Sequence, residues 1–278
     1  MIIVKKENVI LKISKYILLI VFSIFSLLPV VYIVLNSFMD TTEIERSLSN
    51  YTFHIIPNFF TLIQYYEVFL RSPEILSKFW NSIMLTVPIV SGQILISIFG
   101  SYAFAKIKFP FKNGIFFVFI LLMLMPYQVT LVPIYIIFKK VNLINSYASV
   151  ILPGIFSTFG VFLLTQFVKS VPSEQCEAAM VDGANHLAIL FKIILPQCKG
   201  AVASLAILSF LDNWSMIEQP LILLPDEKQP LSIFLSQVNQ SDIKVAFAAG
   251  VLFMIPSIFI FLKGENQLLE GIQHLDLK

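Results

Sequence analysis

Six stretches of the chain are apolar over a length close to the 20 or so residues that a helix needs to cross a bilayer. They cover residues 16–38, 81–105, 114–138, 149–168, 201–224 and 245–262. The first follows several lysines, as in a signal peptide, but its apolar part is too long and no small-residue cleavage site follows it. The pattern therefore predicts an all-α, polytopic membrane protein with six transmembrane helices.

The polar segments between these stretches differ in charge. Cytoplasmic loops of membrane proteins carry an excess of lysine and arginine. With the N-terminal segment inside, twelve of the nineteen basic residues are cytoplasmic, namely Lys5, Lys6, Lys12, Lys15, Lys106, Lys108, Lys112, Lys169, Lys192, Lys199, Lys263 and Lys278. Lys139 and Lys140 are a local exception on the outer side. The distribution predicts that both termini are cytoplasmic.

Composition supports the membrane interpretation and excludes other classes. The chain is 57% hydrophobic and 13% charged, whereas soluble domains carry about 25% charged residues. A net charge of +2 without a basic stripe gives no indication of nucleic-acid binding. Cys176 and Cys198 are too few for a zinc site, and the three histidines share no metal-ligand spacing, so we expect no bound metal.

Small residues on the second predicted helix indicate close packing. Ser97, Ser101 and Ala105 recur every four residues, and Gly92 and Gly100 lie on a nearby face. In lipid, such small-residue faces let helix backbones approach one another.

The segment 169–200 is a long, patterned loop between the fourth and fifth predicted helices. Ser173 is a candidate N-cap followed by Glu174, which suits the positive end of a helix. The pair Asp182-Gly183 ends that helix, because glycine tolerates the left-handed conformation. A second helical stretch follows, with Leu187, Leu190, Phe191 and Ile194 on one side, and ends before Pro196.

The residues of this loop resemble the EAA loop of the permeases of ABC importers. The matching positions are Glu177, Ala178, Ala179, Asp182, Gly183, Ala184, Phe191, Ile194 and Pro196. Gly200 departs from the pattern, since many relatives have a second proline there. The segments 103–110 and 125–133 further resemble the second permease of maltose-type carbohydrate importers, and matching stretches run from about residue 28 to 271.

The resemblance implies a type I ABC-importer permease fold and a single transmembrane permease domain over residues 1–278, with a core at 80–265 and the coupling loop at 169–200. It implies a multi-pass protein of the cytoplasmic membrane, with lipid around it. The implied partners are a second homologous permease, two copies of a cytoplasmic ABC ATPase and an extracytoplasmic solute-binding protein. In such an assembly the loop docks on the ATPase.

ATP chemistry is assigned to a partner by the same resemblance. The chain contains no G-x-x-x-x-G-K-[ST] phosphate loop, the usual nucleotide-binding motif. We therefore expect a transport subunit and no enzyme, with no cofactor bound by this chain and with ATP and magnesium used by the partner ATPase.

A polar cluster interrupts the fifth predicted helix. An acid at the bilayer centre costs about 2.5–3.5 kcal/mol on insertion scales, so Asp212 is expected to face a water-filled path or a polar partner. Asp212, Asn213, Trp214 and Glu218 are the candidate lining of a translocation pathway, in which amide and acid groups bind hydroxyls and the indole stacks on a sugar ring. Alternatively, Asp212 and Asn213 hydrogen-bond between helices.

The function expected from these observations is import of a sugar or oligosaccharide driven by ATP. A glycerol-phosphate-type polar solute is an alternative on the same scaffold. An ion-coupled secondary carrier is a further alternative, although no internal repeat of the kind common in carriers is present and such a carrier leaves the loop 169–200 unexplained. A membrane-embedded enzyme requires clustered acids or histidines, and only Asp212 and Glu218 come close.

Overall fold

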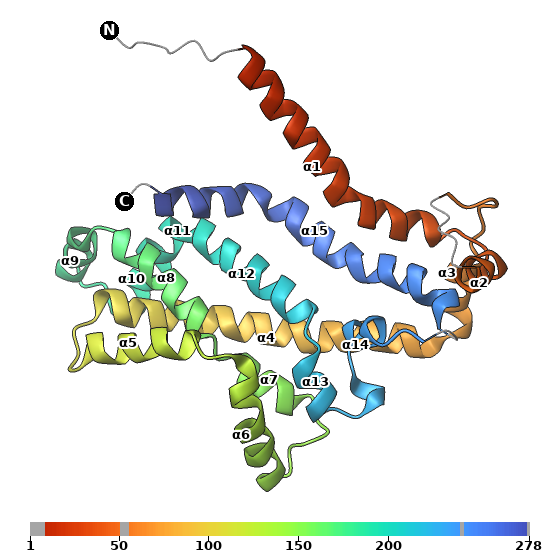
Figure 1. Ribbon diagram of the computed structural model, residues 1–278. Coiled ribbons are helices and arrows are strands. Elements are labelled where there is room, and N and C mark those ends of the chain that lie inside the picture. The colour runs from red at the N-terminus through yellow and green to blue at the C-terminus, as the bar shows by residue number, and fades with distance from the viewer. Residues whose placement is uncertain (1–8, 51–55, 240–241, 277–278) are drawn as a thin grey trace. The chain divides into compact units, whose positions relative to one another are not determined.

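The computed structural model describes residues 9–50, 56–239 and 242–276, and the side chains of these except 9–11, 48 and 268–276. The described residues are helical apart from turns and one isolated bridge between Met39 and Phe60. The chain divides into two compact units, Met1–Pro73 with Val238–Leu252 and Glu74–Gln237 with Phe253–Lys278. The expectation of a single permease domain stays a prediction. Figure 1 labels the helices.

The first unit holds one long helix and several short ones. Its elements are α1 (Val9–Asn36), α2 (Thr41–Ser49), α3 (Ile63–Tyr66), the π-helical turn η1 (Glu67–Arg71) and the first residues of α15 (Ile243–Asp276). The end of α1 is fixed by the buried Gln64, whose amide donates to the carbonyls of Asn36 and Met39 at 2.6 and 2.9 Å. The ring of Tyr32 meets Phe247 edge-on at 5.9 Å.

The second unit is built on α4 (Pro73–Lys106), the 34-residue helix that runs through the whole unit in Figure 1. The helices around it are α5 (Lys112–Met123), α6 (Tyr127–Lys140), α7 (Ala148–Gly154), α8 (Thr158–Ser170), α12 (Lys199–Trp214), α13 (Glu218–Leu223), α14 (Leu231–Ser236) and the rest of α15. A 3-10 turn, η3 (Asp226–Lys228), precedes α14.

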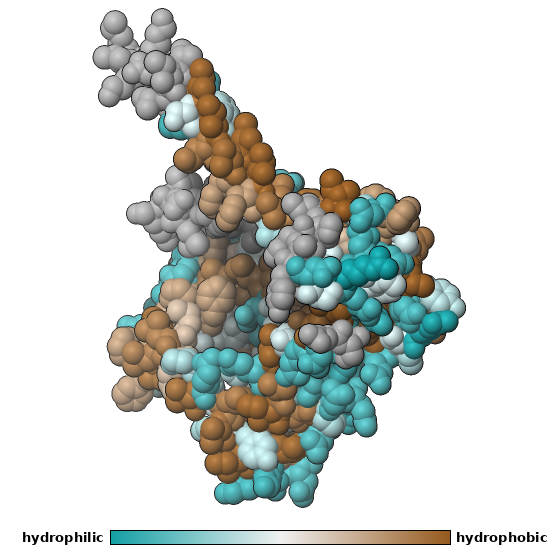
Figure 2. Space-filling model, turned by 45° about the vertical axis from the view of Figure 1, so that its right-hand side comes forward, coloured by the Kyte–Doolittle hydropathy of each residue, from teal (hydrophilic) through white to brown (hydrophobic). Residues whose placement is uncertain are grey.

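The predicted spans are confirmed in number only when bent pairs are counted as single spans. Within the part of the chain that the structure describes, four helical segments are long and apolar enough to cross a membrane, and two bent pairs raise the number to six. The four segments are Lys12–Asn36, Pro73–Lys106, Ala148–Ser170 and Ile243–Gln267. Hydrophobic side chains accordingly cover large brown areas of the face seen in Figure 2.

Two of the predicted helices are broken in the structure. The expected helix at 114–138 is α5 and α6, which meet at 99°. Pro126 lies at this break with extended backbone (ψ 135°). Proline has no N–H with which to continue a helix and disfavours helical backbone at the residue before it, which favours a break at this point. The expected helix at 201–224 ends at Trp214, and Ser215–Ile217 separate it from α13.

The small-residue face of α4 is buried, as predicted. Ser97 and Ser101 are 0% and 1% exposed. A Cβ on Gly160 of α8 would overlap the Ser97 hydroxyl, and one on Gly100 would lie 3.1 Å from Val161. The α4 and α8 backbones therefore approach closely through small residues, which is the usual helix contact in lipid.

Candidate functional site

The first helix of the loop 169–200 is α9 (Ser173–Val181), whose residues Glu177, Ala178 and Ala179 are good helix formers. The prediction that Ser173 caps this helix is wrong. Pro172 occupies the N-cap position and no side chain accepts a cap hydrogen bond, so Ser173 is the first helical residue. Proline has no N–H to satisfy, which makes it acceptable at a helix start.

Gly183 ends α9 in the way that the sequence predicts. Its φ is +83°, the left-handed region. The N–H of Gly183 donates to Met180 O at 3.0 Å, and the N–H of Ala184 donates to Ala179 O at 2.9 Å. These two bonds form a Schellman motif, which satisfies carbonyls at a helix C-terminus and favours glycine at this position.

The second half of the loop is α10 (His186–Ile189), the π-helical turn η2 (Leu190–Ile194) and α11 (Leu195–Gln197). The Asn185 side chain caps α10 by accepting from Ala188 N–H at 2.8 Å. Contrary to expectation, the helix does not end before Pro196. The N–H of Leu195 bonds to Leu190 O across a wide turn, and the helix passes through Pro196 to Gln197.

One side of the loop is anchored in the core of the second unit. Cys176, Ile189, Leu190 and Ile194 are at most 4% exposed and pack in a cluster with residues of α4, α8 and α12. The expected apolar side is therefore only partly correct, because Leu187 is 57% exposed. Phe191 is half exposed and meets the Phe99 ring edge-on at 6.2 Å.

The opposite side of the loop faces outward. Glu177, Ala178 and Asp182 are exposed. Val181 is 88% exposed, and Met180 and Leu187 are also exposed. Apolar side chains are therefore exposed beside the Gly183 turn, on the side of the loop opposite its buried leucine and isoleucine residues.

Two polar contacts tie the loop to the helix ends beside it. The Tyr102 hydroxyl of α4 lies 2.9 Å from His186 Nδ1. The Lys106 ammonium, at the end of α4, donates to Val171 O just before α9.

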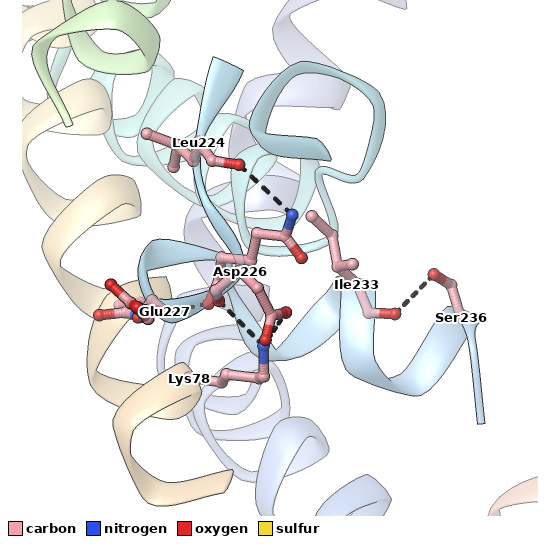
Figure 3. Close-up of polar contacts among 8 residues, drawn as sticks. Lys78, Leu224, Asp226, Glu227, Ile233 and Ser236 are labelled. Carbon is pink, nitrogen blue, oxygen red and sulfur yellow. Dashed lines mark hydrogen bonds and ion pairs between the residues drawn. The ribbon is translucent and has the colours of Figure 1, made fainter. Parts of the chain in front are cut away.

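A second polar network lies near the other end of α4 and holds the segment 224–236 (Figure 3). The Lys78 ammonium points at Asp226 and donates to its carboxylate at 2.8 Å and its carbonyl at 3.0 Å. Asn81 donates to the carbonyls of Glu227 and Gln229 at 2.8 and 3.1 Å. The network fixes this connection in one position against α4.

A recess of about 570 Å³ opens in the second unit where three helices are interrupted, a volume within the range of about 300–1,000 Å³ typical of small-molecule sites. The break between α5 and α6, the break between α7 and α8 and the break between α12 and α13 all line it. Its polar side chains are Gln93, Tyr127, Thr130, Ser157, Thr158, Asp212, Asn213, Ser215, Glu218 and Gln219.

Side chains of the recess satisfy the backbone groups that these breaks release. Gln93 donates to Gly154 O at 2.7 Å at the end of α7, and Ser157 accepts from Gly160 N–H at 3.0 Å at the start of α8. The Ser215 hydroxyl bonds to the carbonyls of Leu211 and Asp212 at the end of α12. Irregular backbone at membrane depth requires such partners or a water-filled cavity.

Three of the four predicted pathway residues, Asp212, Asn213 and Glu218, lie in this recess. The Glu218 carboxylate accepts from Gln128 Nε2 at 2.9 and 3.0 Å. Trp214 is not brought to the recess. It is 2% exposed, donates to Phe253 O at 2.9 Å and stacks on Phe253 at 5.6 Å, so its ring is not available to stack on a solute in this structure.

Sequence reasoning missed several other residues of the recess, notably Gln93, Ser157 and Gln219. Ser157 was detectable as an N-cap serine three residues before Gly160, after the break signal of Pro153. Gln93 carried no local signal, since a single glutamine in an apolar helix is as consistent with a packing contact as with a pathway.

Broken apolar helices around a polar recess, with an ordered loop at one end, define a polytopic membrane transport permease. The chain belongs to the family described as binding-protein-dependent transport system inner membrane component, whose family profile matches residues 93–262. It is a multi-pass protein of the cell membrane, and the predicted family is thereby confirmed.

Relatives cover most of the chain. It is 28% identical to an arabinooligosaccharides transport system permease protein of Halalkalibacterium halodurans, over 88% of both chains. It is 28% identical to an sn-glycerol-3-phosphate transport system permease protein of Yersinia pestis, over 69% of this chain and 70% of that one. An osmoprotective compounds uptake permease protein of Synechocystis is 31% identical, over 73% and 70%.

The fold also matches a solved structure. A chain of a bacterial ABC transporter involved in the import of the acidic polysaccharide alginate superposes with a TM-score of 0.82, at 22% identity, over 96% of this chain and 99% of that one. This likeness supports the ABC-importer permease fold that the sequence predicts.

Proposed function

We propose that this chain is the permease subunit of an ATP-driven importer and forms one side of the pathway for a sugar or oligosaccharide. The observation that carries the proposal is the convergence of three helix breaks on one polar recess. Discontinuous membrane helices characteristically surround solute sites, where their freed backbone groups face a cavity.

The charge of the recess favours a neutral, hydroxyl-rich solute. Its described lining holds two carboxylates, of Asp212 and Glu218, several amides and hydroxyls, and neither lysine nor arginine. Carboxylates and amides accept and donate hydrogen bonds to hydroxyl groups, whereas a phosphate ester calls for basic partners. The arabinooligosaccharide relative agrees with a sugar, and the sn-glycerol-3-phosphate relative keeps a glycerol-phosphate-type solute as the second candidate.

The loop 169–200 is the proposed docking element for the ATPase. Its outward side presents Val181, Met180 and Leu187 beside the Gly183 turn. Its inward side is packed against α4, α8 and α12, so a push on the loop reaches helices that line the recess. The loop end of the second unit is then cytoplasmic, in agreement with its lysines, and cytoplasmic termini stay a prediction from the lysine distribution.

The partners in this proposal are a second homologous permease, two copies of an ABC ATPase and an extracytoplasmic binding protein. ATP and magnesium bind to the ATPase, and this chain supplies the pathway and the docking loop. Since the family is that of binding-protein-dependent transport components, delivery of the solute by a binding protein follows directly.

Purification of the tagged chain from its own membrane in mild detergent tests the assembly. Co-purification of a second permease and an ATPase, identified by mass, is the expected result. Recovery of this chain alone, still able to transport in vesicles without ATP, would replace the proposal with an ion-coupled carrier.

Substrate class is tested with the same complex in proteoliposomes. ATP hydrolysis is measured with the binding protein and either neutral oligosaccharides or glycerol 3-phosphate. Stimulation by an oligosaccharide supports the sugar assignment, whereas stimulation only by glycerol 3-phosphate would favour the second candidate.

A further inference from the structure

A second recess, of about 360 Å³, lies at the loop end of the second unit between α4 and α5. Its lining is Lys108, Phe109, Phe111, Lys112, Asn113 and Gly114. All of these residues precede or begin α5, and none lines the solute recess. The proposed transport cycle assigns them no role.

Positive charge is concentrated around this second recess. Burial, and after it the charges of Lys169 and Lys106, lower the pKa of the Lys112 ammonium, so these three lysines lie near one another. Lys112 donates to Ile107 O at 3.0 Å, and Lys106 donates to Val171 O. Among the described residues, none of the lysines 106, 108, 112 and 169 forms an ion pair with a carboxylate, so no described carboxylate compensates this charge.

Aromatic rings lie in and beside the recess. Lys169 Nζ lies 4.9 Å from the centre of the Phe116 ring, which joins α8 to α5 at this point. Phe111 is 86% exposed, so its ring is not covered by the rest of the chain that the structure describes. The side chains that follow on α5 form an exposed apolar surface, including Phe117 and Val118.

We infer that this recess binds the phosphodiester headgroup of an anionic membrane lipid. Uncompensated lysines supply the charge that a phosphate needs, and basic clusters at a membrane surface attract anionic lipids. The exposed apolar face of α5 starts directly beside the recess, so the acyl chains of a bound lipid lie along α5 while its phosphate meets Lys108 and Lys112. A soluble phosphate would leave Phe111 and this apolar face uncovered.

Native mass spectrometry of the importer complex in detergent tests the inference. The complex is titrated with phosphatidylglycerol and, separately, with phosphatidylcholine, and the bound lipid is counted. We expect the Lys108→Gln/Lys112→Gln variant to bind phosphatidylglycerol about 25-fold more weakly, about 5-fold for each lysine. The interaction should also weaken with added salt, since the charges are at the surface.

Two control variants and one substitute variant complete the test. The charge-preserving Lys108→Arg/Lys112→Arg variant should bind as the natural chain does, and Lys139→Gln/Lys140→Gln, which removes two lysines from the end of α6, should also leave binding unchanged. If the double glutamine variant does not assemble, Lys108→Gln alone, at an exposed position, should show the 5-fold loss.

Several results would overturn the inference. Equal binding of both lipids, or unchanged binding of phosphatidylglycerol in the glutamine variants, would show that the recess does not bind an anionic headgroup. Competition by inorganic phosphate at millimolar concentration would assign the recess to a soluble anion. Loss of the ATPase from the glutamine variant, with lipid binding unchanged, would assign the lysines to a protein partner. None of these results bears on sugar import itself, which is measured separately.

Discussion

The Gly183 turn offers the sharpest test of how the coupling loop works. No atom outside the local chain lies within 4 Å of the position that a Cβ would take at Gly183. The first carbon of a new side chain there meets no such neighbour, so the strain that a substitution causes within this chain lies in the backbone. With φ at +83°, an ordinary L-residue is strained by roughly 1–2 kcal/mol, and a β-branched residue by more.

The strain can be compared with what holds the turn together. The two hydrogen bonds of the Schellman motif, from Gly183 and Ala184, contribute about 1 kcal/mol each. The strain in Gly183→Val, about 2–3 kcal/mol, equals or exceeds their sum, so the turn opens and α9 loses its fixed position. Gly183→Ala should be intermediate. Gly183→Asn should be close to the natural chain, because asparagine tolerates the left-handed region.

Uptake by membrane vesicles energised with ATP measures the effect, at matched levels of the permease in the membrane. The expected order of transport is Gly, Asn, Ala and then Val, with the ATPase recovered in the same order on purification. Membrane insertion should not change, because the turn lies outside the spans. Wild-type transport and ATPase recovery in Gly183→Val would refute the docking role of the loop.

Three further predictions concern other parts of the chain. Asp212→Ala should lower solute-stimulated uptake about 10-fold or more without loss of assembly, because it removes a hydrogen-bond acceptor from the recess. Unchanged uptake would show that Asp212 does not contact the solute. Lys78→Met should free the segment around Asp226, which is checked by faster tryptic cleavage at Lys228 than in the natural chain. Burial raises the pKa of the Cys198 thiol to about 11, so the neutral thiol persists at neutral pH and maleimide should label it only after denaturation; rapid labelling of the native protein would contradict this burial.

Much of the molecule follows from local sequence. The apolar stretches determine where helices cross the membrane, because every backbone group in lipid must be satisfied within the segment. Gly183 could be assigned a left-handed turn since glycine is the residue that adopts it without strain. Asp212 and Glu218 stood out because acids are costly in a span.

Only the tertiary structure decided which prolines in the apolar stretches break a helix. Pro126 and Pro153 were visible in the sequence, but a proline in a membrane helix can bend it or break it, and the outcome depends on whether distant side chains satisfy the freed backbone. Gln93 does so for Gly154, across 61 positions of sequence. The burial of Trp214 under Phe253 and the pairing of Lys78 with Asp226 are likewise contacts between remote segments. The hydropathy of a segment indicates whether lipid or water surrounds it. It carries no information on which remote side chain bonds to the backbone groups that a helix break leaves free.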